Sequence, residues 1–196
     1  MKSGTRSWTF AISFILGGCV SLSNVQGPSE LKLGPDEGIV IIGAPEGTKL
    51  VIHSGDLKDG KFHADGWLPD GIVGTAEGGY LVRKLRVAPA GRGYGLVSIV
   101  ADKRYAANCG QRMAMFNVKP GEVTYLTDFS FPSSGSGSVG VRNSTDLPAA
   151  SAYMKARFFG AAPEPKQGEI TSVPQGRCQS GGGGTTYIPI YIPRGK

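Results

Sequence analysis

The sequence is poor in the side chains that most catalytic and metal sites require. Its 196 residues include three cysteines and two histidines, and charged residues make up 18% of the chain. It contains no Gly-x-Ser-x-Gly nucleophile elbow and no Gly-x-x-x-x-Gly-Lys-Ser/Thr phosphate loop. We therefore expect no cofactor, no metal site and no enzymatic activity.

Membrane-spanning runs and blocks of like charge are also absent. The apolar stretch Trp8–Leu16 is far shorter than the ~20 residues that a spanning helix needs. The net charge of +6 is mild, and the basic residues are scattered along the chain rather than grouped. This distribution argues against a nucleic-acid partner.

The first residues have the layout of an export signal. Lys2 and Arg6 are followed by the apolar run Trp8–Leu16 and then by Leu16-Gly17-Gly18-Cys19. An apolar residue, two small residues and a cysteine resemble the lipobox of bacterial lipoproteins. The resemblance implies that residues 1–18 are a signal peptide, that Cys19 is the lipidation site, and that the acylated Cys19 binds the lipid bilayer. The alternative is an ordinary secretory signal with an incidental cysteine.

The resemblance also predicts where the protein works. Two or three acyl chains form an effectively permanent anchor, because each buried methylene contributes about 0.8 kcal/mol. Lipoproteins retained at the inner membrane commonly have Asp directly after the cysteine, whereas this chain has Val20 and Ser21. We expect a lipid-anchored protein of the cell envelope, on the outer membrane and facing the periplasm.

The other two cysteines, Cys109 and Cys178, remain as a pair in an oxidising compartment. A disulfide between them is the favoured interpretation, with free thiols or a metal pair as alternatives. His53 and His63 are the only histidines that could add metal ligands, and their spacing matches no metal motif.

The central part of the chain has the pattern of a β-protein. Glycine occurs 31 times, about twice its usual ~7% share, which favours turns over long helices. Residues 54–79 are predicted to form a loop. The expected strands are Ile39–Ile42 with Thr48–His53 as its hairpin partner, Tyr80–Val87, Tyr94–Val100, Met113–Val118 and Val123–Phe131.

Alternation predicts which side chains share a face of two of these strands. In the first, Tyr94, Leu96, Ser98 and Val100 form one face, and Val97 and Ile99 form the other. In the second, one side holds Val123, Tyr125, Thr127, Phe129 and Phe131.

Turn and strand residues of this region resemble a known class of domain. The chain looks like small β-sandwich domains of periplasmic lipoproteins, similar to the transthyretin-like, carboxypeptidase-regulatory type. The resemblance covers about residues 37–132 and implies a mostly β fold, a single antiparallel β-sandwich, with no catalytic residues to transfer. It depends on Pro89, Ala90, Gly91, Tyr94, Phe116, Val118, Pro120, Gly121, Glu122, Tyr125 and Leu126.

One short helix is expected near residues 146–159, within a domain that spans residues 36–160. Asp146 or Thr145 caps it, Pro148 lies in its first turn, and it ends at Gly160. Its apolar side is predicted to contain Ala152, Ala156 and Phe159.

The ends of the chain are expected outside this domain. Residues 19–35 read as a flexible tether. Residues 161–196 form a Pro- and Gly-rich extension, with a strand near Glu169–Val173. Within it, Thr186–Pro193 is either an edge or docked extended segment, or a disordered aromatic tail that binds a partner.

The sequence leaves two candidate functions, one non-enzymatic and one that requires a binding or active site. The first is a non-enzymatic envelope accessory or protein-interaction module. The second is a periplasmic enzyme or small-ligand or metal-binding protein, with a site in residues 54–79 near His53, His63 and Trp67. Four acidic residues in that region suggest either a solvated loop or, without the usual spacing, a calcium site: Asp56, Asp59, Asp65 and Asp70.

Overall fold

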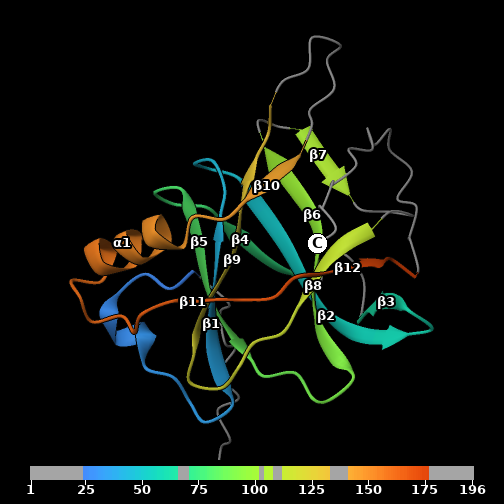
Figure 1. The fold of residues 1–196 in the computed structure, drawn as a ribbon, viewed down its shortest axis with the longest axis horizontal. Coiled ribbons are helices and arrows are strands. Elements are labelled where there is room, and N and C mark those ends of the chain that lie inside the picture. Colours follow the sequence, from blue (N-terminus) through green and yellow to red (C-terminus); the bar gives the residue numbers. More distant parts are fainter. Residues whose placement is uncertain (1–23, 66–70, 102–103, 108–111, 133–140, 177–196) are drawn as a thin grey trace, which may run out of the picture.

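The described part of the chain folds into two β-sheets that face each other, with one helix on the outer side of one sheet (Figure 1). The computed structural model describes residues 24–65, 71–101, 104–107, 112–132 and 141–176. Sheet A contains β1 (Glu37–Gly43), β5 (Tyr80–Arg86), β9 (Val123–Ser130), β10 (Arg142–Ser144) and β11 (Lys166–Gln167). Sheet B contains β2 (Lys49–Lys58), β3 (Lys61–Ala64), β4 (Ile72–Thr75), β6 (Arg92–Ala101), β7 (Arg104–Ala107), β8 (Arg112–Phe116) and β12 (Thr171–Pro174).

The predicted fold class is confirmed: the chain is mostly β, with two sheets and a short helix. The strand order is β10-β9-β1-β5 in sheet A and β12-β8-β6-β2-β3 in sheet B. Pairing is antiparallel except that β1 and β11 each run parallel to β9.

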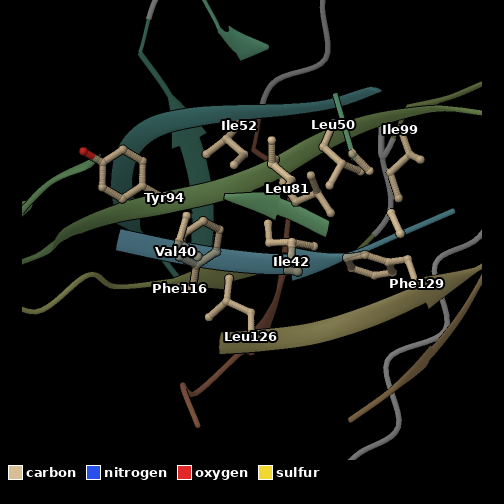
Figure 2. Close-up of a cluster of buried hydrophobic side chains, with 14 of the residues drawn as sticks. Val40, Ile42, Leu50, Ile52, Leu81, Tyr94, Ile99, Phe116, Leu126 and Phe129 are labelled. Atoms are coloured by element: carbon tan, nitrogen blue, oxygen red, sulfur yellow. The ribbon is translucent and has the colours of Figure 1, made fainter. Parts of the chain in front are cut away.

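The two sheets enclose a main core to which both contribute (Figure 2). Val40, Ile42 and Leu126 reach it from sheet A, and Leu50 and Phe116 reach it from sheet B. Each fully buried side chain of this size contributes roughly 1.5–3 kcal/mol. This burial is the main force that holds the sheets together.

Strand β1, in the interior of sheet A, is buried on both faces. Val40 and Ile42 enter the main core, whereas Ile39 and Ile41 enter a second cluster beneath the helix, here called the helix-side core. A strand buried on both faces has no polar alternation. That explains the unbroken apolar run that marks β1 in the sequence.

The predicted hairpin between Ile39–Ile42 and Thr48–His53 is wrong. The connection after Gly43 crosses from sheet A to sheet B, where β2 pairs with β3, β4 and β6. β1 pairs instead with β5 and β9. The residue pattern shows that a segment is a strand, but the partner depends on distant residues.

The loop predicted over residues 54–79 is also wrong in large part. β2 continues to Lys58 and turns into β3, and β4 follows at Ile72–Thr75. The turn is made by Asp59 and Gly60, with φ of 51° and 70°. Positive φ at both central residues is typical of two-residue hairpin turns, in which Asp-Gly is a preferred pair.

Bulges change the predicted faces of β6 and β9. The β2–β6 register shifts between Val51 and Ile52, so Ile99 lies in the main core with Leu96 instead of on the opposite face. In β9, Tyr125 belongs to the helix-side core and Phe129 to the main core. The β1–β9 register shifts between these two positions. An extra residue reverses the alternation beyond it.

The predicted helix is present as α1 (Leu147–Arg157), and Asp146 is its N-cap. The Asp146 carboxylate accepts a hydrogen bond from the Ala149 amide at 3.0 Å. The predicted buried side is wrong. The buried residues are Ala150, Ser151, Met154 and Phe158, whereas Ala152, Ala156 and Phe159 are exposed.

Residues 24–35, assigned to the tether from the sequence, pack against sheet A. The amide of Val25 donates to the carbonyl of Val82 at 3.0 Å. Val25 and Leu31 are buried in the helix-side core with Met154 and Phe158. The 3-10 turn η1 (Pro28–Leu31) lies beside α1 (Figure 1).

The C-terminal strap, residues 166–176, pairs with both sheets. β11 adds to β9, β12 adds to β8, and Gln175 bridges to Phe62 of β3. Sheet B therefore curls back towards its own far edge. The concave surface encloses a third cluster, here called the outer core, of Phe62, Val97, Met113, Met115 and Val173.

Candidate functional site

The His53 side chain is buried near the end of the apolar part of β2. Its exposed fraction is 3%, and its Nδ1 lies 3.2 Å from the Asp65 carbonyl oxygen. Nε2 has no hydrogen-bond partner in the described part of the chain, and a Cβ at Gly71 would overlap it. The ring fills a packed space beside Gly71.

The second histidine lies on the other face of the β2–β3 hairpin. His63 is the Cα partner of Asp56, whereas alternation puts His53 on the opposite face with Gly55. The His63 ring packs against Gly176. The two histidines predicted to share a site are therefore separated by the sheet, and Trp67 lies outside the described residues.

Three of the four acidic residues of this region are described, and two of them pair with basic side chains. Asp56 accepts from Arg92 at 2.8 Å and pairs with Lys58 at 2.8 Å. The hydrogen bond from Lys58, assisted by the charge of Arg92, lowers the pKa of Asp56. Asp65 accepts from Ser54 at 2.8 Å and also contacts Arg92, while Asp59 forms the hairpin turn.

Across the described ranges, no three His, Cys, Asp or Glu side chains come together as a metal site would require. Asp70 lies outside these ranges, as do Cys19, Cys109 and Cys178. Lipidation and the disulfide therefore stay predictions.

A polar cluster that the sequence did not predict lies between sheet A and the start of α1. The Tyr125 hydroxyl accepts a hydrogen bond from the Asp146 amide at 2.8 Å and also bonds to the Asp128 carboxylate. A Cβ at Gly43 would overlap Asp128 Oδ1, which is buried and has no hydrogen-bond partner in the described segments. Glycine at position 43 leaves the space that this carboxylate occupies.

Burial determines the ionisation of this cluster. Removal from water raises the pKa of Asp128, and the nearby charge of Asp146 adds to the shift, while the hydrogen bond with Tyr125 opposes it. Burial likewise raises the pKa of Tyr125 above its usual range. The phenol therefore stays protonated at neutral pH and donates to Asp128.

Replacing Asp128 with Asn is expected to stabilise the fold at neutral pH. Because the folded-state pKa of Asp128 is raised, ionisation opposes folding above that pKa, and the penalty vanishes as the pH falls below the unfolded value. Thermal unfolding across pH 3–8 should show the gain of Asp128→Asn near pH 7 and its loss near pH 3. Asp36→Asn, at an exposed position, is the control, and equal gains at both pH values would contradict the assignment.

An open cleft of about 510 Å³ lies where the C-terminal strap leaves sheet A. Leu57, Met115 and Phe116 give it an apolar part, and the ion pair of Lys166 with Glu122, at 2.7 Å, lies along it. Neither histidine lines this cleft. Two charged side chains of its lining therefore neutralise each other.

Searches of protein-family models, of curated proteins and of solved structures gave no match to the chain. The transthyretin-like resemblance therefore stays a prediction. In the part of the chain that the structure describes, no helix has both the length and the apolar character needed to cross a bilayer.

Proposed function

We propose that the chain is a lipid-anchored lipoprotein of the bacterial envelope that faces the periplasm and serves as a non-enzymatic accessory or protein-interaction module. The observation that carries the proposal is Leu16-Gly17-Gly18-Cys19 after a basic start and a short apolar run. The presence of Val20 where inner-membrane lipoproteins commonly have Asp favours the outer membrane as the site of attachment.

The geometry of the described residues supports an interaction role over an active site. The two histidines lie on opposite faces of one hairpin. The acidic residues near them pair with Arg92 and Lys58. A catalytic pair needs a nucleophile and a base within hydrogen-bond reach of each other.

Two measurements test this function. Mass spectrometry of the mature N-terminal peptide should find it to begin at acylated Cys19, and an unmodified Met1 or an unmodified Cys19 would reject the anchor. Cross-linking the lipidated protein in its own envelope and purifying it should capture a protein that a Cys19→Ala chain does not capture. Capture of the same proteins by both chains would contradict an interaction that depends on anchoring.

We also propose the disulfide between Cys109 and Cys178. Cys109 precedes Arg112 by three residues and Cys178 follows Pro174 by four, and Arg112 and Pro174 are Cα partners in the β8–β12 pairing. Segments this short span at most about 10–14 Å and leave the sheet from paired positions, so a bond between the two cysteines is within their reach. Peptide mapping without reductant should find the two cysteines in one linked peptide, and both thiols reacting with iodoacetamide in the native protein would exclude the bond.

A further inference from the structure

Phe159 is presented to solvent in a backbone conformation that aromatic residues rarely adopt. Its exposed fraction is 87%, the largest among the exposed large hydrophobics of the described residues. Its φ is 51°, and it lies two positions after Arg157, the last residue of α1. A left-handed conformation strains a residue that carries a Cβ, and an exposed ring gains nothing from burial. The fold itself therefore does not account for an aromatic residue here.

The outer face of α1 continues this apolar surface. Ala152 and Ala156 are exposed on this face, and Phe159 follows after the helix has ended, while the opposite face of α1 covers sheet A. Lys155 lies on the same outer side, paired with Glu164 at 3.1 Å. The helix thus has one apolar face on the sheet and an exposed outer side that carries Ala152, Ala156 and the Lys155–Glu164 ion pair.

The N-terminal segment is held beside this end of α1. Asn24 and Gln26 both hydrogen-bond to the Glu77 carboxylate, at 3.2 and 3.3 Å. Arg157, in the last turn of α1, binds Glu77 at 2.8 Å and Gln26 at 3.1 Å. One ionic cluster therefore ties the start of the described chain to the residue that lies two positions before Phe159.

The proposed lipid anchor is close in sequence to the segment that lies beside Phe159. Cys19 precedes Asn24 by five residues, which span at most about 18 Å. If Cys19 is acylated, the Glu77–Arg157 corner must lie close to the bilayer. An exposed aromatic ring beside lysine and arginine is the composition of a membrane-interface contact.

We propose that Phe159 and the outer face of α1 rest on the bilayer interface, so that the lipoprotein lies on the membrane through this corner with sheet B facing away. The inference depends on the proposed function, since the acyl chains supply the attachment. Phe159 then sets the orientation of the domain on the membrane, and the acyl chains hold it there.

The test places a tryptophan at this corner of the lipidated protein. Trp8 leaves with the signal, so a Trp67→Phe, Phe159→Trp chain, here called the corner probe, carries a single tryptophan after processing. The matched control, here called the sheet probe, is Trp67→Phe, Leu57→Trp, because Leu57 is 44% exposed and belongs to sheet B. Each chain is reconstituted into vesicles of phosphatidylethanolamine and phosphatidylglycerol, with and without brominated phosphatidylcholine, after circular dichroism has confirmed the same melting temperature.

Brominated lipid should quench the tryptophan emission of the corner probe at least about twofold and leave the emission of the sheet probe unchanged. Equal quenching of both probes, or of neither, in chains that float with the vesicles overturns the membrane contact and leaves the lipid anchor intact. A blue-shifted emission from the corner probe without quenching places a protein, such as a second copy, on this face and also overturns it. Chains that carry no acyl group and do not float reject the proposed function itself.

Discussion

Replacing Cys19 with alanine is expected to move the protein from the membrane to the soluble periplasmic fraction. The thiol of Cys19 is the acceptor of the lipid in the proposed lipobox. A single acyl chain binds a membrane only marginally, whereas two or three hold it almost irreversibly. Loss of all of them should therefore lower the membrane-bound share by at least about tenfold, which immunoblotting of separated membrane and soluble fractions measures.

The matched control for this experiment is Cys178→Ala. It removes the same side chain from a position with no part in the proposed lipobox, so the protein should stay in the membrane fraction. Inhibiting the lipoprotein signal peptidase should also make the wild-type precursor accumulate with residues 1–18 attached. Membrane retention, at the wild-type level, of a Cys19→Ala chain that has lost residues 1–18 would show that another element holds the protein on the membrane.

Features encoded in neighbouring residues could be predicted from the sequence. Asp146 and Pro148 mark the start of α1, and Pro89 and Gly91 mark a turn in which the Arg92 amide donates to the Pro89 carbonyl at 3.1 Å. The run Ile39–Ile42 marks a buried strand. Each of these signals depends on backbone preferences or local capping, so no knowledge of distant partners is required.

Features that depend on distant contacts could not be predicted. The register shift between Val51 and Ile52 depends on the pairing of β2 with β6. It places the Ile99 side chain in the main core. The sequence predicts the wrong buried side of α1 because alanines and aromatics occur on both sides of this segment. Which face packs is decided by the position of Val25 and Leu31 in the helix-side core, and these residues come from the opposite end of the chain.

The polar cluster of Asp128 carried a weak sequence signal at most. A glycine at the end of the apolar strand β1, Gly43, and an acidic residue inside the apolar strand β9 are both departures from an otherwise regular pattern. Only the parallel pairing of β1 with β9 shows that Gly43 leaves space for the Asp128 carboxylate. Such paired exceptions mark candidate sites better than single residues do.

Replacing Phe62 with alanine is expected to be among the most destabilising single changes in the described chain. Phe62 is fully buried and is the largest side chain of the outer core. Its ring lies against Gly55 and Gly95. A side chain at either glycine would overlap the Phe62 ring. Its carbonyl also accepts from the Gly176 amide at 2.7 Å, which holds the C-terminal strap against β3.

The size of the effect follows from the cavity that the substitution creates. Truncating a buried Phe to Ala commonly costs about 3–5 kcal/mol, which in a domain of this size lowers the melting temperature by about 10 °C. Leu57 is the Cα partner of Phe62 and is 44% exposed, so Leu57→Ala is the matched control with an expected cost below about 1 kcal/mol. Thermal unfolding of both variants tests whether the outer core is tightly packed or whether the curl of sheet B is a loosely attached edge. Similar melting temperatures for both would mean that the strap and β3 contribute little to stability, because only a packed outer core makes the loss of the Phe62 ring costly.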